Sequence, residues 1–412
     1  MVQGTDADRA QLLATLRIQY PDTLADAGYS LLDPVSGEQF GTNERHLVAT
    51  CRAVANFSMG TIANGPEWCL PAAEHGLEFL DTGHRAADGD GYYLVVDGDG
   101  KPMDETRSAY AHAFVLLAYA RAVQAGITDV TAGLEATHDL LEEKFRDDRG
   151  LLRSDCDTDW NELEAYRGQN ANMHACEAYV AAYEATGEER YLGRARTIAA
   201  GITVELAAET GGLLWEHYTA QWDHDFGYNR DEPHHQFRPP GYQPGHHAEW
   251  AKLLGLLDRH ETDPATRPRR LDTDGGWYSR AVELFDAAVD LGWTTDGFAY
   301  TVDRDGEILV PDRYGWAVAE GLGAAAVLRE RAEVHGDEEA ARRFDKWGDQ
   351  LEAAADGYRG PAGLWYEKCL AAQECGDPIP PEPPGVEPDY HPAGAFFECW
   401  RSAEDAATVW DR

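Results

Sequence analysis

The segment at residues 242–257, YQPGHHAEWAKLLGLL, places ionisable side chains at the start of an apolar helix. Trp250 and the leucines that follow it recur at helical spacing, which predicts one buried face. His246 lies one turn before Trp250 on that face, and Glu249 is its neighbour on the helix surface. Because burying an unpaired charge is costly, the pattern indicates either a satisfied structural pair or a polar cavity that water can enter. In such a cavity a histidine could transfer protons near neutral pH.

A second histidine stands in the same kind of position near the end of the chain. In residues 387–400, EPDYHPAGAFFECW, His391 lies at a loop-to-helix junction directly before an apolar run. Two histidines at equivalent positions of different units could face each other across one cavity, which is the geometry that a two-sided proton transfer requires. Asn170 and His174 lie along one line of a predicted helix, where polar side chains either reach a common ligand or form an exposed stripe.

Residues 231–247 contain four histidines and raise the question of a metal site. Two adjacent pairs separated by ten residues match no standard ligand spacing, and no CxxC or HExxH motif accompanies them. A stiff loop that carries Arg238 between prolines is the better interpretation, so no metal and no other cofactor is expected. The chain also lacks a GxSxG elbow, a P-loop and a Rossmann glycine pattern. The carboxylate pair of a glycoside hydrolase cannot be recognised among 74 acidic residues.

The elements that must position these residues follow a recurring pattern. Six segments combine a glycine, a short strand-like patch and turn residues with an amphipathic helix, at spacings of roughly 50 to 85 residues. This spacing leaves room for two helices per unit, about twelve in all, and many of them end at a glycine. We therefore expect residues 1–412 to form a single all-α domain, six helical hairpins in a closed ring, with short β-hairpins at one end.

Composition limits the partners and the compartment. The chain has 412 residues with 74 acidic and 35 basic side chains, a net charge of −39, which predicts adaptation to high salt and argues against nucleic acid and anionic membranes as partners. No signal peptide or membrane-spanning run is visible. Seven scattered cysteines without CxxC spacing predict reduced thiols in a cytoplasmic protein. The sequence sets no oligomeric state.

Five motifs, in order along the chain, resemble the N-acylglucosamine 2-epimerase superfamily, and within it the mannose isomerase and sulfoquinovose isomerase branch. They are RHLVATCRAVANFSMG, YAHAFVLLAYA, YRGQNANMHACEAYVAAYEATGE, YQPGHHAEWAKLL and WAVAEGLGAAAVL. The resemblance implies an (α/α)6 barrel and cofactor-free proton chemistry on a small-molecule sugar. The motif after His391, PAGAFFECW, departs from the branch, so the choice of substrate stays open.

The resemblance also implies a set of site residues. The catalytic residues would be His246, His391 and Glu249. Substrate contacts and the cavity wall would come from Arg52, Tyr110, Asn170, His174, Arg238, Trp316 and Glu320. In this scheme His391 moves the proton between C2 and C1, while His246, oriented by Glu249, opens the sugar ring.

The predicted activity is an intramolecular oxidoreduction, the conversion of a free aldose to a ketose through an enediolate. D-mannose to D-fructose is the expected type, and sulfoquinovose to sulfofructose is the other substrate of the branch. If both histidines reached C2 from opposite faces, the product would be a 2-epimer, as in N-acylglucosamine or cellobiose epimerases. A glycoside hydrolase and a non-catalytic sugar-binding ring are the remaining alternatives.

Overall fold

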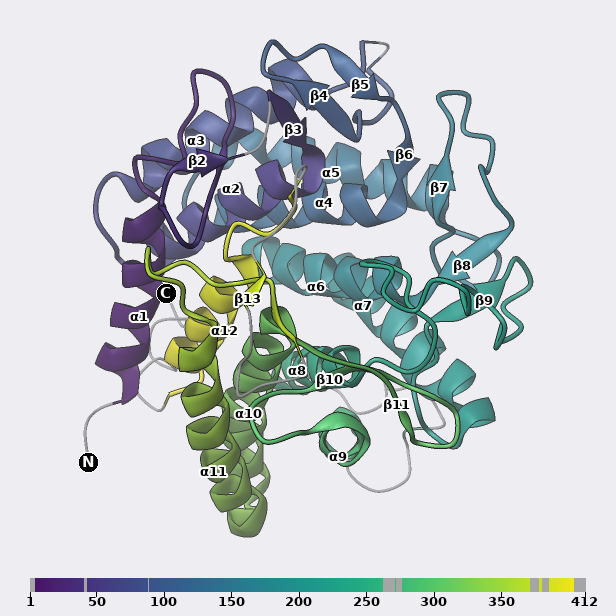
Figure 1. Ribbon diagram of the computed structural model, residues 1–412. Coiled ribbons are helices and arrows are strands. Elements are labelled where there is room, and N and C mark those ends of the chain that lie inside the picture. Colours follow the sequence, from purple (N-terminus) through teal and green to yellow (C-terminus); the bar gives the residue numbers. More distant parts are fainter. Residues whose placement is uncertain are drawn as a thin grey trace.

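The structure, a computed structural model, describes residues 4–40, 43–87, 89–261, 271, 276–370, 378–379 and 385–403. This part of the chain is mostly helical, with twelve α-helices and several small antiparallel sheets (Figure 1). The expected helical class, helix number and short strands are therefore confirmed. The helices are α1 (Gly4–Gln19), α2 (Leu47–Ile62), α3 (Cys69–Phe79), α4 (Ala109–Gln124), α5 (Thr131–Leu140), α6 (Gln169–Thr186), α7 (Glu189–Ala200), α8 (Pro244–Arg259), α9 (Gly276–Gly292), α10 (Gly315–His335), α11 (Glu338–Ala355) and α12 (Tyr390–Arg401).

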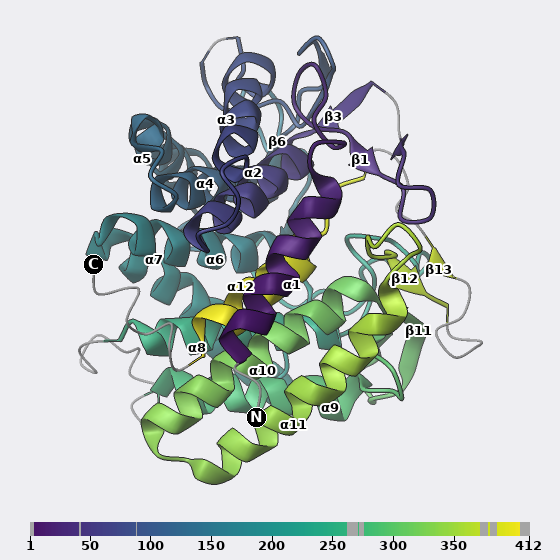
Figure 2. The same ribbon diagram turned by 90° about the vertical axis from the view of Figure 1, so that its left-hand side faces the viewer.

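The helices pack in pairs. Helix α2 lies against α3, α4 against α5, α6 against α7, α8 against α9, and α10 against α11. The sixth pair brings together distant parts of the sequence, because α12 packs against α1 (Figure 2). The sequence pattern predicted two helices for each unit but did not predict that the first helix would pair with the last.

One helix of each pair is buried on nearly every face: α2, α4, α6, α8, α10 and α12. These inner helices are rich in alanine and large apolar residues, so they approach closely and present no broad polar face to solvent. Each contacts the next inner helix, and α12 contacts α2. Their partners are one-sided. In α11, for example, Ala340, Phe344 and Leu351 are buried, whereas most of the charged residues between them are exposed.

The short strands lie where the chain enters the inner helices. Strand β3 (Glu44–His46) leads into α2, β6 (Arg107–Ser108) into α4, β8 (Tyr166–Gly168) into α6 and β11 (Ile308–Tyr314) into α10. The other strands are β1 (Leu31–Leu32), β2 (Gln39–Phe40), β4 (Val95–Asp97), β5 (Pro102–Asp104), β7 (Asp155–Cys156), β9 (His217–Thr219), β10 (Ala299–Val302), β12 (Lys368–Cys369) and β13 (Pro378–Ile379). The sheets pair β1-β2, β3-β4-β5, β6-β7, β8-β9 and β10-β11-β12-β13, and in the last sheet Arg313 is opposite Cys369. These strand-to-helix junctions fix the first turns of the inner helices.

The cysteines correct one expectation. Cys369 is in a disulfide, so the prediction of reduced thiols is wrong at this position, and Cys375 lies outside the described residues. Free thiols are found at Cys51, Cys69, Cys156, Cys176 and Cys399. Among the described helices, none combines the length and apolar character that a membrane span needs.

Candidate active site

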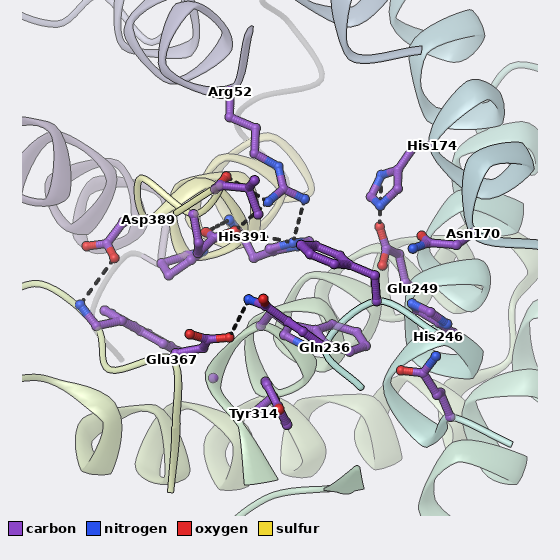
Figure 3. Close-up of a pocket in the computed structure, with 18 of the residues that line it drawn as sticks. Arg52, Asn170, His174, Gln236, His246, Glu249, Tyr314, Glu367, Asp389 and His391 are labelled. Carbon is purple, nitrogen blue, oxygen red and sulfur yellow. Dashed lines mark hydrogen bonds and ion pairs between the residues drawn. The ribbon is translucent and has the colours of Figure 1, made fainter. Parts of the chain in front are cut away.

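A pocket lies at the N-terminal ends of the inner helices (Figure 3). Each inner helix contributes at least one lining residue from its first two turns, and one such set is Arg52, Tyr110, Asn170, His246, Trp316 and His391. Helix N-termini carry partial positive charge, so six of them directed at one pocket favour negative charge that develops inside it. Proton abstraction from a carbon next to a carbonyl creates such charge on oxygen.

Eight of the ten predicted site residues line this pocket, and Arg238 and Glu320 do not. The eight are Arg52, Tyr110, Asn170, His174, His246, Glu249, Trp316 and His391. Histidines from α8 and α12, which are 145 residues apart in sequence, therefore share one hollow. The Trp316 ring contacts both, with centroid distances of 5.1 Å to His246 and 5.9 Å to His391.

His246 is paired with Glu216, a residue that the sequence analysis did not identify. Its Nδ1 lies 2.9 Å from Glu216 Oε2, and the Gln169 amide donates to the same oxygen at 2.8 Å. The Trp250 indole donates to Gln169 Oε1, which turns the amide nitrogen towards Glu216. The Gln169 amide nitrogen also lies 2.8 Å from His246 Nδ1, but an ionised carboxylate can only accept. We therefore assign the Nδ1 proton to the bond with Glu216, which leaves the lone pair on Nε2. Burial alone would raise the pKa of Glu216, but the charge and hydrogen bond of His246 lower it.

His391 is held in the same way by Glu320. Its Nδ1 lies 2.8 Å from Glu320 Oε1, and its Nε2 lies 3.3 Å from Arg52 Nη2. Glu320 was expected in the wall of the cavity, but it is buried behind His391 and bonded to Lys252. Burial acts to raise the pKa of Glu320, and the Lys252 charge together with the bond from His391 lowers it. The two histidines thus form two similar Glu–His pairs, each with Nε2 as the basic nitrogen.

Glu249 does not orient His246, which corrects the predicted pairing. The i, i+3 spacing makes the two residues neighbours on α8, but the Glu249 carboxylate lies 3.6 Å from His174 Nδ1 (Figure 3). Burial and the nearby charge of Glu320 raise the pKa of Glu249 well above its ordinary value. Burial lowers the pKa of His174 to about 4, although His174 also bonds to Glu177, so the imidazole is neutral near pH 7.

Arg238 lies outside the pocket that the histidines share. It lines a neighbouring cavity, where its guanidinium bonds to Asp155 at 2.8 Å, to Glu164 and to Tyr228. Its charge is therefore already balanced by two carboxylates. Tyr110 and Asn170 line both cavities and mark the boundary between them.

The sequence analysis missed two functional candidates, Glu216 and Glu387. Glu216 lies in β-strand surroundings 30 residues before His246, and no spacing rule links the two. Glu387 is one helical turn before His391. Its carboxylate accepts from Arg52 at 2.9 Å and from the His391 backbone N–H at 3.1 Å. The i, i+4 spacing in EPDYH was the one signal that could have identified it.

Two trios bring three potential metal ligands within 4.8 Å of one another: His174, Glu177 and Glu249, of which Glu177 is half-buried, and the fully buried Glu249, Glu320 and His391. Among the described residues, neither trio includes a histidine of residues 231–247. The ammonium of Lys252 is bonded to Glu320 and supplies a positive charge to this cluster. We assign no metal to these residues.

Known proteins resemble this chain over most of its length. The sequence profile described as N-acylglucosamine 2-epimerase (GlcNAc 2-epimerase) matches residues 28–395. The chain is 33% identical to the D-mannose isomerase of Marinomonas mediterranea over 95% of this chain and 96% of that protein. It is 36% identical to the D-mannose isomerase of Thermobifida fusca over 87% of this chain and 83% of that protein.

Solved structures of similar fold include a D-mannose isomerase and a cellobiose 2-epimerase. A crystal structure of D-mannose isomerase superposes with a TM-score of 0.84 at 33% identity, covering 96% of this chain and 97% of that one. A cellobiose 2-epimerase from Bacillus thermoamylovorans superposes with a TM-score of 0.77 at 18% identity, covering 96% of this chain and 98% of that one. At that identity the second likeness concerns the fold alone.

Proposed function

This chain belongs to the N-acylglucosamine 2-epimerase family, and we propose that it is a cofactor-independent aldose–ketose isomerase for a free, neutral sugar of the D-mannose type. The observation that carries the proposal is the pair of imidazoles in one pocket, each held at Nδ1 by a buried glutamate. Two such groups can remove a proton from one atom and deliver a proton to another without a cofactor.

The proposed reaction proceeds through an enediolate. His391 Nε2 removes the proton from C2 of the open-chain aldose and returns it to C1, while the carbonyl shifts from C1 to C2. His246 carries protons to and from the ring and carbonyl oxygens, which opens the pyranose first. Arg52, whose guanidinium lies beside His391 Nε2, stabilises the negative oxygen of the intermediate. No atom is lost or gained, since aldose and ketose are isomers.

The relatives favour isomerisation over 2-epimerisation. The two D-mannose isomerases named above match most of this chain at or above 33% identity. The cellobiose 2-epimerase of Ruminococcus albus matches only 37% of it, at 26% identity. The 2-epimerase activity is the second candidate, because the same two bases could serve opposite faces of C2.

The charges of the pocket favour a neutral sugar over a sulfonated one. Its lining residues include the acids Glu367 and Glu387, together with Glu249 and Asp389, whose pKa values are raised by burial. Among the described lining residues, Arg52 is the single arginine or lysine, and it is already bonded to Glu387. Since Arg238 is committed to carboxylates in the next cavity, a sulfonate would meet acidic side chains without a free cation.

The proposed site also depends on the finer architecture of the fold. We infer that residues 1–412 form one catalytic domain in which the six inner helices close into an (α/α)6 barrel. The contact of α12 with α2 supports closure, because it joins the last inner helix to the first. Closure brings His391 on α12 beside Arg52 on α2. In an open array of helices, with α2 and α12 at opposite ends, these two residues would lie far apart.

The test is the conversion of D-mannose in D2O, with the product identified by NMR. Fructose as the product supports the isomerase. Deuterium at its C1 would mean that the transferred proton exchanges with solvent, and hydrogen at C1 would mean that the proton stays within the site. Glucose without fructose establishes the 2-epimerase instead. The His391→Ala and His246→Ala variants should each lose on the order of 10²-fold or more in kcat. Near-normal turnover in either variant would remove the role assigned to that histidine. Parallel assays with sulfoquinovose, cellobiose and a mannose oligosaccharide test the other substrate classes.

A further inference from the structure

Lys252 is a buried lysine beneath the pocket that is neither among the predicted site residues nor used in the proposed mechanism. It lies on α8, six residues after His246, and is only 4% exposed. Its ammonium bonds to the Glu320 carboxylate, the same carboxylate that accepts from His391 Nδ1. A fully buried lysine is rare and is retained only where charged partners compensate its desolvation.

Ionisable groups from four inner helices surround this ammonium. Glu177 and His174 come from α6, and Glu249 shares α8 with Lys252. Glu320 comes from α10, and His391, which reaches the cluster through Glu320, comes from α12. Within this described cluster, three carboxylates face one ammonium and two imidazoles. Arg52 of α2 adds a second positive charge that acts on Glu249, and the Tyr390 hydroxyl donates to Glu177 at 2.7 Å. Burial alone would lower the pKa of Lys252, but the charges of Glu320, Glu177 and Glu249 raise it, so the lysine is charged near pH 7.

The two Glu–His pairs differ at this point. Glu216 is held by the neutral amide of Gln169, which can donate to the carboxylate in any state of charge. Glu320 is held by a cation and lies among two further acids. Carboxylates that share one dry site cannot all ionise unless a cation balances them. The ionised form of Glu320 therefore depends on Lys252, whereas Glu216 has no comparable dependence.

We propose that Lys252 is a positioning residue of the reaction, which keeps Glu320 ionised and directed at His391 Nδ1. The proposal rests on the proposed function, because it gives His391 the task of a base at Nε2. An ionised Glu320 accepts the Nδ1 proton and leaves the lone pair on Nε2, beside Arg52. A protonated Glu320 would compete as a donor, and the imidazole would lose both its orientation and the tautomer that the reaction needs.

The test replaces Lys252 by Met, which keeps the length of the side chain and removes its charge. In Lys252→Met, kcat for mannose should fall roughly 10- to 100-fold with little change in KM. The acidic limb of the kcat profile should move up by roughly one pH unit, because Glu320 then takes up a proton at higher pH. Lys252→Arg, which keeps the charge, should restore part of the activity and move the limb back.

The matched control is Arg331→Met. Arg331 on α10 is a buried cation that bonds to Asp258 on α8 at 2.9 Å, so it joins the same two helices without touching the pocket. It should lower the melting temperature as Lys252→Met does, but leave kcat per folded molecule and the pH profile unchanged. The proposal would be overturned if Lys252→Met and Arg331→Met lost equal amounts of kcat. A Lys252→Met enzyme with normal kcat and an unshifted pH profile would overturn it as well.

A measurement without substrate separates this proposal from the proposed function. The Nδ1 proton between His391 and Glu320 should give a strongly deshielded proton resonance, identified by its loss in His391→Gln. It should persist in Arg331→Met and shift or disappear in Lys252→Met. If the wild-type enzyme turned over no aldose and the resonance still responded to Lys252, the proposed function would fail and the positioning role would stand. If the resonance were the same in the wild type, Arg331→Met and Lys252→Met, the positioning role of Lys252 would be refuted.

Discussion

Glu216 offers the sharpest test of the Glu–His pairs, because Glu216→Gln removes one charge and little else. His246 Nδ1 lies 2.9 Å from Glu216 Oε2, which puts the centres of the two charges about 4 Å apart when His246 is protonated. At that separation the attraction is about 4 kcal/mol for the effective dielectric constant of about 20 that suits protein sites. Since about 1.4 kcal/mol corresponds to a tenfold change in rate, steps that place positive charge on His246 should slow by roughly 10²- to 10³-fold.

The assay is the initial rate of fructose formation from mannose as a function of pH, with folding monitored by circular dichroism. Glu184→Gln is the matched control. The Glu184 side chain on α6 is 4% exposed, against 2% for Glu216, and it bonds to His260 at 2.9 Å and to Arg121 and Arg401. It lies away from the pocket and lines a separate cavity. It should cost stability without a comparable loss of kcat. A Glu216→Gln enzyme within about threefold of wild type would refute the argument that the carboxylate supports charge on His246.

Three further predictions follow from charge and burial. Arg52→Ala should lower kcat/KM by at least about 10²-fold, whereas Arg238→Ala, outside the pocket, should change it by less than about threefold, as measured with mannose. Burial raises the pKa of Asp389 to about 8, so the folded state binds this proton more tightly than the unfolded state and stability falls as pH rises from about 4 to about 8. Asp389→Asn should flatten that slope in urea unfolding, and an unchanged slope would contradict the assignment. With a net charge of −39, the midpoint of unfolding should rise between dilute buffer and molar salt, and a constant midpoint would remove the prediction of salt adaptation.

The extent of the sequence prediction can be seen at particular residues. The helical spacing after His246 and the apolar run after His391 correctly placed both residues at the starts of buried helices, since periodicity is a local property of the chain. The i, i+3 spacing of His246 and Glu249 suggested a pair that does not form. A helix surface brings the two residues close, but the side chain of Glu249 turns to His174 on α6, and that choice depends on a neighbouring helix.

The partners of the reactive groups were decided by tertiary structure. Glu216 precedes His246 by 30 residues, Glu320 precedes His391 by 71, and Arg52 is 339 residues from His391. No local pattern links such positions, because they meet only when separate helices pack. The pairing of α1 with α12 was hidden for the same reason.

The amino-acid sequence alone determined the helical class, the repeating helix pairs, the acidic surface and the family, because these follow from composition, periodicity and motifs that are contiguous in the chain. Tertiary structure decided which carboxylate holds each imidazole, that Arg238 lies in another cavity, and that Lys252 pairs with Glu320 beneath the pocket. Hydrogen bonds and ion pairs depend on distances of a few ångströms between helices, and packing alone sets those distances.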